Sequence, residues 1–155
     1  MTTIVPQAGL TRKLVDALYV EAMVMADEAR AYFEDHGVEA RDHLPPSHRV
    51  GYAVESLKVT TRLMHVIAWL LTWRGEAAGE IDVVMAREPD RRLGITAASD
   101  ADTVTDLPED AQRLIAASED LYKRVRKLER DLLAPPEEPK VSPARSLLGR
   151  LERAF

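Results

Sequence analysis

The stretch that decides the fold is YAVESLKVTTRLMHVIAWLLTWRGEAAGE, residues 52–80, which contains no proline. Apolar residues in and just before it recur at spacings of three and four, the pattern of an α-helix. At about 100° per residue they fall on two nearly opposite stripes. One stripe is Val50, Val54, Leu57, Thr61, Met64, Ala68 and Leu71; the other is Val59, Leu63, Val66, Leu70 and Trp73. A helix that is apolar on two sides is either central in a bundle or has both an intramolecular and an intermolecular partner.

This central helix is predicted to begin near Ser47, a residue type that favours the N-cap position, and to stop at Gly79. Before it, residues 10–36 predict another helix with core positions at Leu14, Leu18, Ala22, Met25, Ala29 and Tyr32. Gly37 is expected to end that helix in the left-handed conformation. Because the connection at 38–46 is short, we expect the two helices to be antiparallel neighbours.

A third helix is predicted over residues 107–133, with Asp106 as its N-cap candidate and Pro108 near its first turn. Its apolar heptad is Leu114, Ser118, Leu121, Val125, Leu128 and Leu132. The preceding residues, 80–106, lack a clear period, and Pro89 interrupts them. The sequence therefore predicts an all-α fold, an antiparallel bundle of three long helices.

The composition changes at Ala134, after which four prolines occur within residues 134–144. Such a segment cannot continue a helix, so we expect a flexible, disordered Pro-rich linker. Residues 145–155 have the pattern of a short amphipathic helix. The expected division is a helical bundle domain at 1–133, followed by the linker and tail at 134–155.

The composition excludes several classes of protein. The 155 residues include no cysteine, which rules out disulfides, thiol catalysis and thiolate metal sites. A net charge of −5 argues against a general nucleic-acid binder. The longest uncharged stretch of the apolar centre, Leu63–Trp73, is far shorter than the roughly 20 residues of a membrane span. No basic segment precedes a long apolar run near the N-terminus, so we expect no secretory signal and a cytoplasmic protein.

The central helix resembles a known family. Its pattern YxxES…TTRLM…WLL…R…GE, read from Tyr52, is similar to that of the RcdA family (regulator of CtrA degradation) of alphaproteobacteria, once catalogued as a domain of unknown function. EAMVMADEARAYFEDHG in the first helix and ASEDLYKRVRKLERDL in the third also resemble that family. The resemblance covers residues 10–133, and its specific part lies at about 52–80.

The resemblance implies a non-enzymatic adaptor in regulated proteolysis and the cell cycle. RcdA-like proteins are helical-bundle homodimers with disordered C-termini. They help deliver cell-cycle regulators such as CtrA to the ClpXP protease, together with the response regulator CpdR. The implied partners are thus a second copy of the chain, ClpXP with a CpdR-like receiver, and a CtrA-like cargo. Location at the cell pole is left open.

The polar side of the central helix is the first candidate docking surface. Its members project within an arc of about 100° and include a tryptophan and an arginine, both enriched at interface hot spots. They are Glu55, Lys58, Arg62, His65 and Trp69. The alternative is that residues 81–105 fold over Trp69 and make it part of the core.

Two further surfaces are candidates. Ala17, Val20 and Val24 form a minor apolar stripe on the first helix, which we interpret as a dimer interface or as ordinary scattered surface residues. In the tail, Leu147, Leu148, Leu151 and Phe155 have the layout of a helix that docks in a groove of a partner. The alternatives are a tail that folds back on its own bundle and a tail that is inert.

No pattern of a metal, cofactor or catalytic site stands out. The four histidines lack the close pairing of a zinc site, and no phosphate-binding glycine loop, nucleophile elbow or HExxH motif occurs. The basic half of the third helix is interpreted as a solvated face or as a contact for an acidic partner or phosphate. We expect a non-enzymatic adaptor; a structural homodimeric scaffold is the main alternative, and a ligand-binding or catalytic bundle a weaker one.

Overall fold

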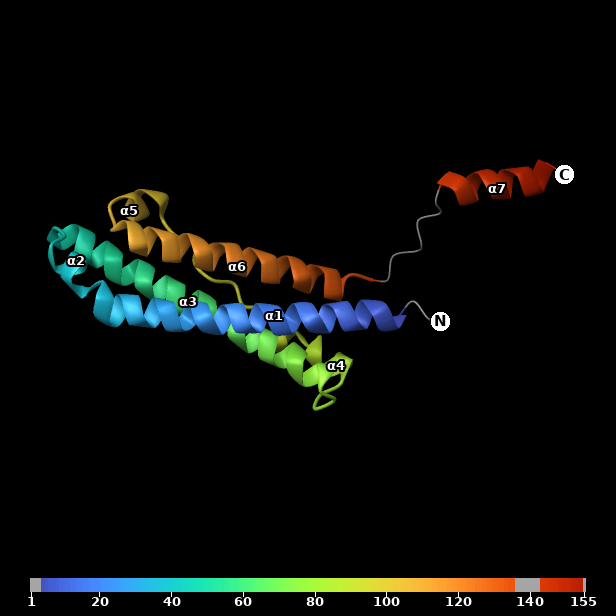
Figure 1. The fold of residues 1–155 in the computed structure, drawn as a ribbon, viewed down its shortest axis with the longest axis horizontal. Coiled ribbons are helices and arrows are strands. Elements are labelled where there is room, and N and C mark those ends of the chain that lie inside the picture. The colour runs from blue at the N-terminus through green and yellow to red at the C-terminus, as the bar shows by residue number, and fades with distance from the viewer. Residues whose placement is uncertain (1–3, 136–142, 155) are drawn as a thin grey trace.

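A computed structural model describes residues 4–135 and 143–154, and every regular element in these ranges is a helix (Figure 1). This confirms the all-α prediction. The long helices of the bundle are α1 (Ile4–Ala31), α3 (Pro46–Ala77) and α6 (Glu109–Leu133). The shorter elements are the π-helix η1 (Tyr32–His36), α2 (Val38–Asp42), α4 (Val83–Ala86), the 3-10 helix η2 (Pro89–Arg91), α5 (Ala101–Thr105) and α7 (Pro143–Ala154).

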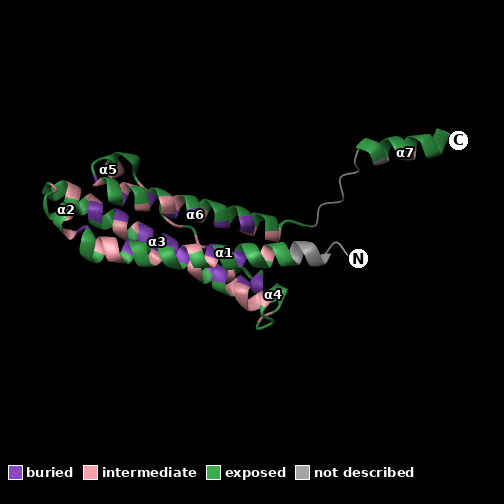
Figure 2. Ribbon diagram, viewed as in Figure 1, coloured by how far each residue is buried: buried purple, intermediate pink, exposed green. Residues whose placement is uncertain are grey.

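Helix α3 is central because it packs against both α1 and α6. Its two apolar stripes have different environments, as the alternating colours of Figure 2 indicate. The second stripe, Val59, Leu63, Val66, Leu70 and Trp73, is buried in the core. The first stripe keeps Val50, Val54, Leu57, Met64 and Leu71 exposed. Among the described residues, the bundle therefore buries one of the two apolar sides of α3 and leaves the other exposed.

The three long helices do not alternate in direction. Helix α1 runs antiparallel to α3, as the short connection predicted, but α3 and α6 run the same way (Figure 1). Residues 87–100 make this possible by returning along the bundle between the end of α3 and the start of α6. Arg87 Nη2 donates to the carbonyl of Leu132 at the C-terminal end of α6. The backbone N–H of Asp100 donates to Glu55 Oε1 in the N-terminal half of α3.

The turn between α1 and α3 differs from its prediction. Gly37 has φ −90° and not the expected left-handed conformation. A glycine is needed there for space instead, because a Cβ would lie 2.4 Å from the Tyr52 hydroxyl and 2.8 Å from the Tyr32 ring. The preceding π-helix carries Tyr32 and Phe33, and their rings pack with Tyr52 to close this end of the bundle.

Other boundaries shift by a few residues. Helix α3 begins at Pro46 with Pro45 as its cap and not at Ser47; the N-cap of α6 is Pro108 and not Asp106. Pro46 at the first helical position explains the start of α3, since the N–H that a proline lacks has no helical partner there. In α6, Pro108 directly precedes the first helical residue, Glu109. Gly79 is left-handed, φ +77°, as expected for a stop. In α1, Val15 is buried in place of the predicted core residue Leu14, which is exposed.

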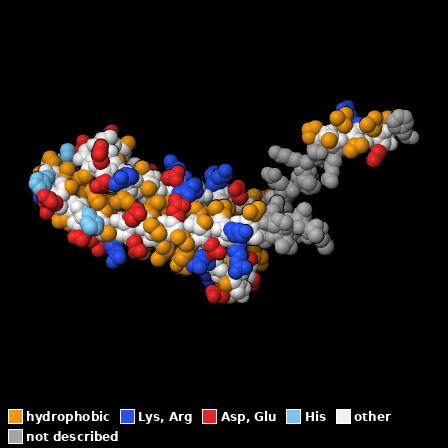
Figure 3. Space-filling view, viewed as in Figure 1, with side chains coloured by type: hydrophobic (Ala, Val, Ile, Leu, Met, Phe, Trp, Pro, Cys, Tyr) orange, Lys and Arg blue, Asp and Glu red, His pale blue; other side chains and the backbone are white. Residues whose placement is uncertain are grey.

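The tail helix α7 confirms the short amphipathic helix expected at 145–155. Leu147, Leu148 and Leu151 are exposed on it, and Figure 3 shows hydrophobic side chains gathered there. The linker residues 136–142 and Phe155 lie outside the described residues.

Candidate protein-docking site

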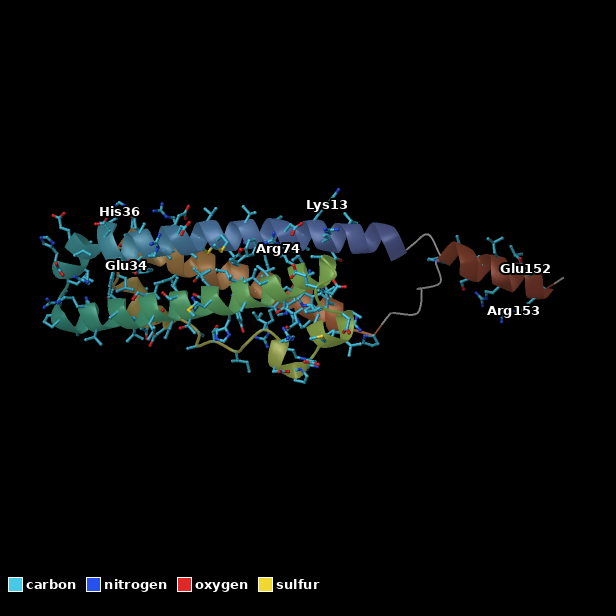
Figure 4. The ribbon with its side chains drawn as sticks, turned by 90° about the horizontal axis from the view of Figure 1, so that it is seen from below. Lys13, Glu34, His36, Arg74, Glu152 and Arg153 are labelled. Atoms are coloured by element: carbon cyan, nitrogen blue, oxygen red, sulfur yellow. The ribbon has the colours of Figure 1, made fainter. Side chains whose placement is uncertain are left out.

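The polar side of α3 is covered by the segment that returns along the bundle. We call residues 92–100 the strap; they lie beside α3 in Figure 4, outside any regular element. Beneath it, Glu55, Arg62 and Trp69 are 0%, 2% and 2% exposed. Lys58 and His65 are half-buried. The prediction that these five side chains form an exposed docking patch is therefore wrong for Glu55, Arg62 and Trp69.

The alternative interpretation of this face describes the structure. Trp69 belongs to a core cluster that also contains Ala86 and Leu93 from the 81–105 segment. Its ring packs against Trp73 with centroids 5.9 Å apart. A partner protein thus has no access to Trp69 while the strap is in place.

A buried guanidinium joins the strap to both neighbouring helices. Arg62 Nη1 donates to Ser118 Oγ of α6 at 2.7 Å, and its Nη2 donates to the carbonyl of Ala97 at 3.1 Å and to Ser99 Oγ at 3.2 Å. Ser118 Oγ in turn donates to the carbonyl of Ile115 at 2.8 Å. Burial lowers the pKa of Arg62, while the carboxylates of Glu119 and Glu55 act in the opposite direction.

Glu55 holds the end of the strap. Its Oε1 accepts from the backbone N–H of Asp100 at 3.0 Å and from Lys58 Nζ at 3.1 Å. Burial raises the pKa of Glu55, but the hydrogen bonds from Asp100, Ser99 and Lys58 outweigh it and hold the pKa below its ordinary value. A lowered carboxylate pKa stabilises the fold above the unfolded-state value and ceases to do so as the pH falls through the folded-state value.

Helix α6 holds the other end of the strap. Glu129 Oε2 accepts from the N–H of Leu93 at 2.7 Å, and the Tyr122 hydroxyl donates to the carbonyl of Gly94 at 2.8 Å. Gly94 lies against the His65 ring, where a Cβ would be 2.3 Å from Nδ1. The roles of Ser118, Tyr122 and Glu129 were missed from sequence. Only Ser118 carried a signal, as the one polar member of an apolar heptad.

The structure leaves the other two candidate surfaces exposed. Val20 and Val24 of the predicted dimer stripe are 61% and 53% exposed, and Ala17 beside them is also exposed. The first stripe of α3 is a larger apolar face, with Leu57 and Met64 at 66% and 65%. Of the predicted tail-docking residues, the three leucines are exposed on α7.

Two further observations bear on the kind of site. Within residues 4–135 and 143–154, no three His, Asp or Glu side chains are grouped so that they could hold a metal ion. No described helix combines the length and the hydropathy that crossing a membrane requires.

The comparisons with known proteins agree with the fold. The family model "Protein of unknown function (DUF1465)" matches residues 7–155. The crystal structure of RcdA from Caulobacter crescentus CB15 is similar, with 33% identity and a TM-score of 0.62, over 77% of this chain and 90% of that chain. No curated protein matches.

The contact between Gly94 and His65 predicts a compensating pair of substitutions. Gly94→Ala should destabilise the domain by about 1–3 kcal/mol, because the new methyl group overpacks the imidazole. His65→Ala removes the ring, so adding Gly94→Ala to His65→Ala should have a much smaller effect. Urea unfolding of the four proteins measures the coupling. Equal effects of Gly94→Ala in both backgrounds would show that the strap does not lie against His65.

Proposed function

Since the chain belongs to the RcdA-like DUF1465 family, we propose that it is a non-enzymatic adaptor that brings a cell-cycle regulator to the ClpXP protease together with a CpdR-like receiver protein. The observation that carries this proposal is 33% identity to RcdA over nine-tenths of that chain. The proposed setting is the cytoplasm of an alphaproteobacterium, as the resemblance of the central helix implies.

The exposed surfaces of the bundle suit a protein that binds other proteins. The first stripe of α3 presents five large apolar side chains along one face, and exposed apolar patches of this kind mark interaction sites. We propose that a second copy of the chain covers this face, with Ala17, Val20 and Val24 of α1 as a second contact. The homodimer would use the apolar side of α3 that the bundle leaves free.

The tail provides a separate contact in this proposal. We take residues 1–133 as the bundle domain, and α7 presents Leu147, Leu148 and Leu151 as a helix-in-groove ligand for a partner. Phe155, the fourth predicted tail residue, lies outside the described residues. A helix of this length is marginal in water and gains stability on docking. A tethered ligand of this kind raises the effective concentration of a second partner.

The adaptor proposal predicts faster proteolysis. Purified ClpXP, a CpdR-like receiver and a CtrA-like cargo should degrade the cargo faster when the chain is added. The readout is loss of cargo on a gel over time, and the control is the same reaction without the chain. If the chain binds its partners but leaves the rate unchanged, the alternative of a structural homodimeric scaffold is favoured.

The dimer proposal predicts a mass of about twice 17.3 kDa by light scattering at micromolar concentration. Leu57→Glu with Met64→Glu should give the monomer mass without loss of helicity, because both side chains are exposed in the single chain. Val20→Glu with Val24→Glu tests the α1 stripe in the same way. A monomeric wild-type chain would contradict the proposal.

Deletion of residues 135–155 tests the tail. We expect the free energy of unfolding to stay within about 1 kcal/mol, because surface changes away from the core have small effects. At least one partner or cargo should bind more weakly in a pull-down. Full binding by the truncated chain would exclude tail docking, and loss of the fold would place the tail in the core.

A further inference from the structure

The outer side of the strap has backbone groups without partners. None of residues 93–99 makes a backbone–backbone hydrogen bond. In the part of the chain that the structure describes, side chains of α3 and α6 hydrogen-bond to the strap at the N–H groups of Leu93 and Asp100, the carbonyls of Gly94 and Ala97, and the Ser99 hydroxyl. Within the described structure, the N–H and C=O groups of Ile95, Thr96 and Ala98 therefore have no hydrogen-bond partner, and Ile95 and Ala98 are exposed residues. Groups of this kind are a template for pairing with another extended chain.

The strap is held at fixed points before any partner arrives. Arg62 and Glu55 bind one end from beneath, and Glu129 and Tyr122 bind the other. Ile95, between these points, is 92% exposed. A partner pairing with a preorganised segment avoids most of the entropy of ordering it.

The side of the strap that faces α6 is positively charged. A hollow of about 200 Å³ lies there, formed by Thr96, Ala97 and Ala98 of the strap with Arg62, Glu119, Tyr122, Lys123 and Arg126. Three cations and one carboxylate therefore line it, in a chain whose net charge is −5. Lys123 and Arg126 are exposed, and neither pairs with a carboxylate in the described part of the chain. Figure 3 shows Lys and Arg side chains gathered along α6.

We propose that the outer edge of the strap, residues 95–98, binds an extended acidic peptide segment of a partner protein. The backbone of that segment pairs with residues 95–98, and one of its Asp or Glu side chains lies in the hollow beside Lys123 and Arg126. The edge supplies affinity through main-chain hydrogen bonds, and the hollow supplies the preference for acid. The proposal goes beyond the adaptor function, since the site is distinct from the α3 stripe and from α7 and needs no protease.

Fluorescence anisotropy with the full chain tests the site. The probe is a labelled eight-residue peptide that alternates valine with Asp or Glu. A lysine-substituted peptide should bind at least about tenfold more weakly, as like charges repel at the hollow. The acidic peptide with alternate backbone nitrogens methylated should also bind at least about tenfold more weakly, because it cannot complete the main-chain hydrogen bonds. Equal binding of the acidic and lysine peptides overturns the proposal, and so does undiminished binding of the methylated one.

A pair of variants tests the residues. Lys123→Glu with Arg126→Glu should weaken binding of the acidic peptide by at least about tenfold. Arg12→Glu with Lys13→Glu makes the same charge change on α1, where Lys13 points away from the bundle (Figure 4), and should change binding by less than about twofold. Circular dichroism confirms that each variant is folded. Equal effects of the two pairs of substitutions on peptide binding overturn the proposal. An eight-nucleotide oligothymidine that binds through Lys123 and Arg126 more tightly than the acidic peptide also overturns it, because that result would show a phosphate site.

Discussion

The hydrogen bonds of one buried guanidinium connect the parts of this fold. Arg62 lies inside α3, binds Ser118 on α6 and binds the strap at Ala97 and Ser99. A buried cation is stable only when its donors are satisfied, because leaving a buried polar group without a partner costs about 1–3 kcal/mol. The strap supplies two of those partners, so its path along the bundle and the charge of Arg62 depend on each other.

The path of the strap explains the direction of the helices. With a tight turn after α3, the third helix would run back antiparallel to it, as in an up-and-down bundle. The strap instead crosses the length of the bundle before α6 begins, so α3 and α6 run parallel. It binds α6 through Glu129 and Tyr122 and α3 through Arg62 and Glu55. The strap therefore fills the polar seam between two parallel helices.

The same arrangement buries the polar side of α3 and leaves one of its apolar stripes exposed. Glu55, Arg62 and Trp69 on the polar side become interior because the strap covers them and supplies hydrogen-bond partners to Arg62 and Glu55. The apolar stripe with Leu57 and Met64 stays exposed because no element of the bundle lies over it. The partner contacts that we propose lie on that stripe, on the outer edge of the strap and on α7. The adaptor role that we propose needs several surfaces of this kind on one small bundle.

Local pattern was enough to determine the long helices, the two apolar stripes of α3, Gly79 as a stop and the amphipathic tail, but not which stripe is core. Periodicity, helix-ending residues and proline act within a few residues, so they can be read along the chain. The same reading identified Glu55, Arg62 and Trp69 as unusual but placed them on the surface. Whether a polar side chain is exposed depends on segments that are distant in sequence: Arg62 meets Ala97, Ser99 and Ser118, up to 56 residues away. Only the tertiary structure brings the strap over α3, because a segment without a period of its own has no local signal of where it packs.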